Sequence, residues 1–232
     1  MVKLVLDAMG GDFAPQEVIR GAKLAIDAYD VFIVFSGQKA VVQPLIDDLN
    51  IPNDRYEILD APDVIEMNDS ASGSYRSKKQ SSIRVGLDYV KDGQADGFVS
   101  AGNTGAIMMA SLMVFGRIEG VDRPALASAM PSQKEPFIMI DLGSNVDCKP
   151  ENLLQFAIMG HFFSKVRLNI SEPKVGLLNI GEEEEKGNVL TLATYPLLKD
   201  SFLNFVGNVE AKYIFQGNVD VVVDTIGIAP DT

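Results

Sequence analysis

Short apolar runs alternate with stretches of helical periodicity along the whole chain. The runs that predict strands are residues 3–6, 31–36, 56–59, 97–100, 136–140, 174–179, 204–206 and 219–223. Between them, apolar residues recur at helical spacing, and Pro15 and Pro150 stand where proline commonly begins a helix. This alternation predicts an α/β fold, a mostly parallel sheet with helices on both faces. We expect residues 1–232 to form a single α/β catalytic domain.

The loops that follow the predicted strands carry most of the candidate chemistry, because ligands of parallel α/β sheets bind at the carboxyl ends of strands. These loops are rich in glycine, amides and carboxylates and poor in histidine and cysteine, which argues against a triad hydrolase. The candidate residues in them are Asp7, Gly10, Gly11, Gly102, Asn103, Thr104, Gly105, Asp141, Asn145, Asn179, Gly181, Glu182, Lys186, Asn188 and Asn208. We expect Asn208 in a loop over residues 207–210.

Residues 180–188 have two interpretations. Four consecutive glutamates, residues 182–185, suit the first turn of a helix, where the dipole favours negative charge. Lys186 does not suit that position. Flanked by Gly181 and Gly187 and followed closely by Asn188, it indicates instead a flexible backbone that approaches an anion.

Two further glycine loops precede predicted helices, at Gly10-Gly11 and at residues 102–105. Their backbone amides and the helix dipoles suit an anion or oxyanion. A tight turn at the first loop and ordinary helix capping by Asn103 or Thr104 at the second are the simpler alternatives. Neither loop is a G-x-G-x-x-G or Walker sequence, so no nucleotide is predicted.

Residues 68–82 form a polar segment that is either a loop or an exposed helix. It carries Arg76, Lys78 and Lys79, which are either a solvated surface or the place where an anionic partner docks. We expect His161 to be packed or capping rather than a base. Cys148 has no identifiable activating base, so we do not assign it as a nucleophile.

Composition narrows the classes of function. An apolar share of 47% beside 22% charged residues is that of a soluble globular protein. A net charge of −12 argues against a general nucleic-acid binder, because phosphate backbones require a basic surface. A single cysteine excludes an internal disulfide and favours a reducing, cytoplasmic setting. No metal and no cofactor is predicted.

Taken in order, several motifs resemble those of the phosphate acyltransferase family, PlsX. They are residues 7–15, the pairs Lys78-Lys79 and Ser81-Ser82, and residues 100–106, 141–150, 179–188 and 204–210. The resemblance implies transfer of a long-chain acyl group from acyl carrier protein to inorganic phosphate, giving acyl phosphate for bacterial phospholipid synthesis. It also implies a fold similar to isopropylmalate dehydrogenases and phosphotransacetylases, and a homodimer loosely associated with the membrane.

In such a reaction phosphate is the nucleophile, so the protein supplies an anion site and oxyanion donors. We expect Lys186 and the amides after Asn103 to hold phosphate, and Asn179 and Asn188 to orient it or to donate to the oxyanion. Asp7 and Asp141 are expected to order neighbouring loops. The cations of residues 76–79 are expected to meet the acidic carrier protein.

The chain departs from the family pattern at three places. Phe13 stands where the family usually has histidine, and Ser144 replaces a usual alanine, which is a minor change. The likeness also ends near Val223, so we expect the chain to lack the family's C-terminal portion. Two alternatives therefore stay open. One is a phosphotransacetylase-like enzyme that uses acyl-coenzyme A, and the other is an inactive, truncated product that binds only phosphate or a partner subunit.

Overall fold

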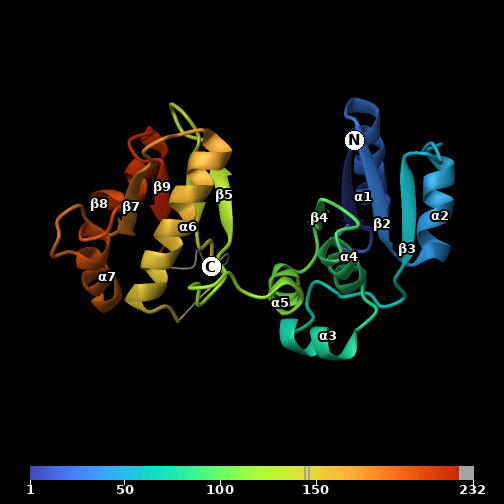
Figure 1. Cartoon of the computed structure of the whole chain (residues 1–232), viewed down its shortest axis with the longest axis horizontal. Helices are drawn as coiled ribbons and strands as arrows, with labels where there is room; N and C mark the ends of the chain where they lie inside the picture. The colour runs from blue at the N-terminus through green and yellow to red at the C-terminus, as the bar shows by residue number, and fades with distance from the viewer. Residues whose placement is uncertain (144, 146, 225–232) are drawn as a thin grey trace. The chain divides into compact units, whose positions relative to one another are not determined.

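The computed structural model describes residues 1–143, 145 and 147–224, and these fall into two compact units. The N-terminal unit is Met1–Gly116 and the C-terminal unit begins at Arg117. Each unit has its own sheet and is described by itself (Figure 1). The α/β class with mostly parallel strands is confirmed, although the strands form two sheets. That the chain acts as one catalytic domain stays a prediction.

The sheet of the N-terminal unit is entirely parallel. Its strands are β1 (Val2–Asp7), β2 (Val31–Gly37), β3 (Tyr56–Asp60) and β4 (Gly97–Val99), in the order β3-β2-β1-β4. All four were predicted to within one residue at each end. Because the strands are parallel, the loops after β1 and β4 leave the same edge of the sheet.

Helices cover both faces of this sheet. On one face, α1 (Gln16–Ala28) and α2 (Lys39–Asp48) pack apolar side chains such as Ile19 and Val42 on Phe35. On the other face lies α4 (Ser82–Lys91), which approaches so closely that a Cβ on Gly86 would lie 2.5 Å from the Phe98 ring. Glycine is therefore required at this helix position.

Two shorter elements complete the N-terminal unit. The polar segment 68–82 contains α3 (Ala71–Ser77), and the very apolar helix predicted after Asn103 is α5 (Thr104–Phe115). Buried side chains of α4 and α5, including Leu87 and Ala110, form a small cluster with Tyr75 of α3 against it.

The sheet of the C-terminal unit has the order β5-β6-β9-β7-β8. Its strands are β5 (Ala127–Met130), β6 (Phe137–Ile140), β7 (Lys174–Asn179), β8 (Asn204–Glu210) and β9 (Val221–Val223). Only β5 is antiparallel, and it was not predicted. Its sequence, Ala-Ser-Ala-Met, has no β-branched or aromatic residue that would indicate a strand.

Two helices, α6 (Pro150–Leu168) and α7 (Val189–Lys199), cover one face of this sheet (Figure 1). The opposite face is covered by the short 3₁₀ helix η1 (Ala211–Gln216), with Ile214 against Phe137 and Val222. His161 on α6 is buried beside Phe162 and Phe202, as expected of a packed histidine.

The prediction of a loop over residues 207–210 is wrong, because these residues are the second half of β8. Val175 pairs with Phe205 and Gly176 pairs with Gly207, so Val206 is an extra residue in a β-bulge. Gly207 has φ 99°, which suits glycine at an irregular position. Gly207-Asn208 resembles a turn sequence, and that local signal hid the strand.

Candidate functional site

In the N-terminal unit, Asp7 joins the loops after β1 and β4. Its Oδ2 accepts a hydrogen bond from the Ser100 hydroxyl at 2.6 Å, and its Oδ1 accepts one from the Met9 amide at 3.1 Å. Ser100 Oγ in turn accepts the Gly102 amide at 3.0 Å. Ser100 was not among the candidate residues, although its place directly after β4 was a usable signal.

Three glycines allow these two loops to pack together. A Cβ on Gly10 would collide with the Asp7 carboxylate, and a Cβ on Gly102 would lie 3.1 Å from the Gly10 Cα. Gly11 has φ 116°. Close backbone approach, rather than a phosphate cradle alone, thus accounts for the glycines here.

Asn103 caps α5 and also tethers the preceding segment. Its Oδ1 accepts the Ala106 amide at 2.9 Å, while Nδ2 donates to the carbonyls of Met67 at 2.8 Å and Asp69 at 3.0 Å. Both ends of the side chain are therefore engaged. The groups left at this helix start are first-turn backbone amides such as those of Thr104 and Gly105, which have no intrahelical acceptor. Their binding of phosphate stays a prediction.

The three cations of the polar segment differ in their surroundings. Lys78 donates to the Val64 carbonyl at 2.7 Å and pairs with Asp69. The hydrogen bond from Lys78 lowers the pKa of the Asp69 carboxyl most, and a hydrogen bond from the Glu66 backbone amide lowers it further. Arg76 and Lys79 are exposed. Lys78 thus holds its own segment together, and docking by the three residues stays a prediction.

In the C-terminal unit, two amides hold the loop that follows β7. Asn179 Nδ2 donates to the Lys186 carbonyl at 3.0 Å, and Asn208 Nδ2 donates to the Glu183 carbonyl at 2.8 Å. The same Glu183 carbonyl accepts the Lys186 amide at 3.1 Å. Both backbone polar groups of Lys186 are therefore fixed.

The glycines of this loop have no room for a side chain. Gly187 has φ 112°, and a Cβ there would lie 2.6 Å from Asn179 Oδ1. A Cβ on Gly181 would lie 2.9 Å from Lys186 Cγ. These positions require glycine for conformation and for space.

The acidic first-turn interpretation of residues 182–185 is wrong, because α7 begins only at Val189. Asn188 caps this helix: its Oδ1 accepts the Thr191 amide at 2.9 Å, and Thr191 Oγ1 accepts the Asn188 amide at 3.0 Å. Thr191 was not singled out, although its spacing from Asn188 is that of a capping box. Whether Asn188 also meets substrate stays a prediction.

The charges of this loop are unevenly paired. Glu184 pairs with Lys199 at 3.0 Å, and that hydrogen bond raises the pKa of Lys199. Lys186 is exposed, and within residues 1–143, 145 and 147–224 its ammonium has no ion pair. The lysine backbone is thus fixed while its charge is available.

Asp141 and Asn145 follow β6. Asp141 is buried with φ 67°, and its Oδ1 accepts from Asn145 Nδ2 at 2.8 Å. Asn145 Nδ2 also donates to the Pro124 carbonyl at 2.9 Å. Burial, followed by the charge of Asp141, raises the pKa of the Cys148 thiol to about 11. This thiol is protonated near neutral pH, which agrees with the decision not to assign it as a nucleophile.

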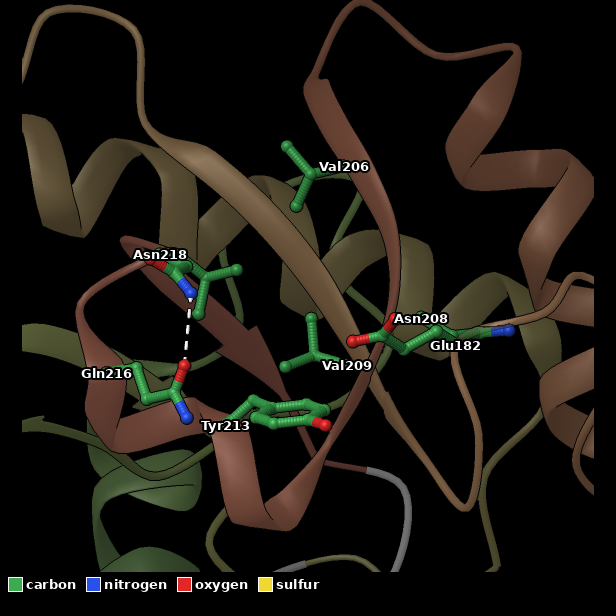
Figure 2. Close-up of a pocket in the computed structure, with 8 residues that line it drawn as sticks. Glu182, Val206, Asn208, Val209, Tyr213, Gln216 and Asn218 are labelled. Carbon is green, nitrogen blue, oxygen red and sulfur yellow. Dashed lines mark hydrogen bonds between the residues drawn. The ribbon is translucent and has the colours of Figure 1, made fainter.

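A pocket of about 390 Å³ opens on the sheet face opposite α6 and α7, between β8 and η1 (Figure 2). Val206, Val209 and Tyr213 supply apolar lining, and Glu182 and Asn208 also line the pocket. Figure 2 shows the Asn208 amide nitrogen on the other side of β8 from Val209. Asn208 therefore directs its donor to the loop rather than into the pocket.

Comparison with known proteins decides the family. A family model described as a fatty acid synthesis protein matches residues 2–229. The chain belongs to this fatty acid synthesis protein family. Its relatives include phosphate acyltransferases from Clostridium tetani, 48% identical, and Halothermothrix orenii, 47% identical. In each case 96% of this chain aligns with 67% of the relative. The predicted likeness to phosphate acyltransferases is therefore confirmed.

Among other relatives in the fatty acid synthesis protein family, a phosphate acyltransferase from Pelotomaculum thermopropionicum is 46% identical, with 96% of this chain covering 65% of it. The chain thus spans about two thirds of the length of these relatives.

Solved structures confirm the fold. The EutD phosphotransacetylase from Staphylococcus aureus matches with a TM-score of 0.66 and 20% identity, covering 96% of this chain and 77% of that one. A branched-chain phosphotransacylase from Enterococcus faecalis has the same TM-score at 12% identity, and the match covers 97% of this chain and 79% of that one. At these identities the likeness is one of fold, as the predicted phosphotransacetylase-like class requires.

Among the described residues, the helices are too short or too polar to cross a bilayer, and no group of three or more His, Cys, Asp or Glu side chains could hold a metal. Homodimer formation, membrane contact and a cytoplasmic location stay predictions.

Proposed function

We propose that the protein transfers a fatty acyl group from acyl carrier protein to inorganic phosphate, and that the loop after β7 holds the phosphate. The observation that carries this assignment is Lys186: both of its backbone polar groups are hydrogen-bonded, while its ammonium is exposed and has no ion pair among the described residues. A fixed backbone with an available cation suits an anion that must be held in one orientation.

The first turn of α7 supports the same assignment. Asn188 caps the Thr191 amide, whereas the amides of Val189 and Leu190 precede the first intrahelical acceptor. These donors and the positive end of the helix dipole lie next to Lys186 in the chain. The neighbouring glutamates are exposed, and Glu184 is neutralised by Lys199, so water and the ion pair weaken their repulsion of phosphate.

The chemistry needs no nucleophile from the protein. A phosphate oxygen attacks the thioester carbonyl, the C–S bond breaks, and the thiolate leaves with a proton as the free thiol of the carrier. Lys186 would lower the repulsion between the phosphate and the developing oxyanion. The raised pKa of Cys148 disfavours a covalent acyl-enzyme at that residue.

The carrier is proposed to dock on Arg76 and Lys79, which are exposed cations of an acidic chain. Acyl-coenzyme A is the second candidate donor, because the likeness to phosphotransacetylases does not distinguish between the two thiols. A homodimer in peripheral contact with membrane lipids also belongs to this proposal.

The test is release of carrier thiol from palmitoyl-acyl carrier protein and phosphate. Lys186→Gln should lower the rate at least about tenfold, because it removes the charge from an otherwise unchanged loop. Lys212→Gln is the matched control, since it removes an exposed cation of the same unit that pairs with Glu210 outside the loop, and it should stay within about twofold of the wild type. Equal rates for Lys186→Gln and wild type would remove the lysine from the mechanism.

Donor choice separates the remaining alternatives. A higher rate with palmitoyl-coenzyme A than with the carrier substrate would favour the phosphotransacetylase-like enzyme. Phosphate binding without transfer from either donor would favour a phosphate-binding protein without acyltransferase activity.

A further inference from the structure

Asn208 is linked to Lys186 by two consecutive hydrogen bonds. Its Nδ2 donates to the Glu183 carbonyl at 2.8 Å, and that carbonyl also accepts the Lys186 amide at 3.1 Å. Asn179, on the neighbouring strand, donates to the Lys186 carbonyl at 3.0 Å. Two side chains from adjacent strands thus bracket one residue of the loop.

The surroundings of Asn208 do not suit direct contact with a substrate. Its side chain is only 6% exposed. It pairs in register with Leu177, whose side chain belongs to the core beneath α6 and α7. Neighbours in a parallel ladder share a face, so Asn208 also points toward that side, in agreement with Figure 2. Its Nδ2 is already hydrogen-bonded to the Glu183 carbonyl in the loop.

The fold keeps this amide despite a cost. Asn208 Oδ1 is buried and has no hydrogen-bond partner among the described residues. An unpaired buried acceptor lowers the stability of the fold, and an apolar side chain on this face would avoid that loss. What the amide supplies in return is the bond to Glu183, and with it the conformation of the loop.

We infer that Asn208 is a positioning residue for Lys186 and does not itself bind substrate. This inference rests on the proposed function and deepens it, and it replaces the substrate-binding role expected for Asn208 from the sequence. Loss of the amide frees the Glu183 carbonyl and lets the Lys186 backbone move, so that the ammonium meets phosphate less often.

The experiment is a double-mutant cycle that measures binding of inorganic phosphate by calorimetry. Asn208→Ala should weaken binding about three- to tenfold in the wild-type background. In the Lys186→Gln background the same change should have no further effect, because the residue acts through the lysine. Asn204→Ala is the matched control: the same residue type on β8 donates to the Glu172 carbonyl at 3.4 Å, away from the loop, and binding should be unchanged.

Three outcomes would overturn the inference. Additive effects of the two substitutions would mean that Asn208 contacts phosphate directly. Unchanged binding by Asn208→Ala, with loss in Lys186→Gln, would mean that the bond to Glu183 does not position the lysine. An equal loss in Asn204→Ala would mean that the effect is a general one of β8.

A second measurement separates this inference from the proposed function. If Lys186→Gln binds phosphate as well as the wild type, the proposed site fails, but hydrogen exchange still tests the positioning. The Lys186 amide should exchange faster in Asn208→Ala than in Asn204→Ala, and equal exchange would overturn the inference. Should Asn208→Ala not fold, as judged by circular dichroism, Asn208→Ser takes its place in both measurements.

Discussion

Cys148 shows how the surroundings of one partly buried side chain bear on the mechanism. Its thiol is partly buried beside Asp141, and its pKa is raised to about 11. At pH 8 the thiolate fraction should therefore be about a hundredfold lower than for a thiol with the ordinary pKa of 9.0. We expect iodoacetamide to alkylate the folded chain slowly, with a rate that still rises above pH 9.

The urea-unfolded chain is the matched control for this prediction, since the same cysteine is there exposed to water. Its alkylation rate should be half-maximal near pH 9 and should rise less than about twofold from pH 9 to pH 10, as for an ordinary thiol. The rate of the folded chain should rise about ninefold over the same interval. A folded chain whose rate levels off at or below pH 8 would show that burial does not protect the thiol, and a covalent acyl-enzyme would again have to be considered.

At the scale of single elements, Gly187 tests whether the loop after β7 depends on a close fit. Gly187→Ala adds a Cβ that would collide with Thr191 Oγ1 and lie 2.6 Å from Asn179 Oδ1, at a residue with φ 112°. We expect a loss of about 2–4 kcal/mol in the free energy of unfolding, from backbone strain and displacement of Thr191 and Asn179 together. Urea unfolding followed by circular dichroism measures it.

Gly93→Ala is the control, because Gly93 also has positive φ, 72°, but no atom lies within 4 Å of the added Cβ. Strain alone should cost about 1–2 kcal/mol there, with phosphate binding unchanged. Equal losses for the two variants would mean that the packing of Gly187 on Thr191 and Asn179 contributes nothing.

The sequence predicted those elements that follow local rules and missed those that depend on pairing with a distant strand. Strands rich in branched apolar residues, such as β1 and β2, and the helix cap at Asn103 follow local rules and were predicted. The cap at Asn188 follows the same rules but was not predicted. The second half of β8 was missed because Gly207-Asn208 favours a turn locally, whereas pairing with β7 overrides that preference.

Contacts between residues far apart in the sequence could not be predicted, because local sequence rules do not describe them. Asp7 and Ser100 are 93 positions apart, and Asn208 and Glu183 are 25 apart. Composition drew attention to Asp7, Asn179 and Asn208, which the structure places at or near the carboxyl ends of β1, β7 and β8. Which carbonyl or hydroxyl each side chain meets depends on strand order and register, and neither can be read from local spacing.

At the scale of the whole molecule, each unit has hydrophobic clusters of its own. Phe156 belongs to the cluster beneath α6, and Phe35 belongs to the cluster beneath α1 and α2. Phe156→Ala should lower the stability of the C-terminal unit by about 3–5 kcal/mol, because a large buried ring is lost. Hydrogen exchange should then be faster in β7 and β9 and unchanged in β1 and β2.

Phe35→Ala is the reciprocal variant, with faster exchange expected in β1 and β2 alone. Faster exchange in both units after either substitution would show that the chain unfolds as one cooperative body. That result would support the single catalytic domain expected from the sequence, which the two sheets by themselves do not establish.

The bulge in β8 has a consequence for how the chain can change length in evolution. Val206 alone, of the seven residues of this strand, stands opposite no neighbour in β7. A homologue that had lost this residue would keep every other side chain of the strand opposite its present neighbour. A deletion at Val209 instead would shift either Asn208 and the residues before it, or Glu210 after it, to the opposite face of the sheet. Gaps in an alignment of this region should therefore fall at Val206.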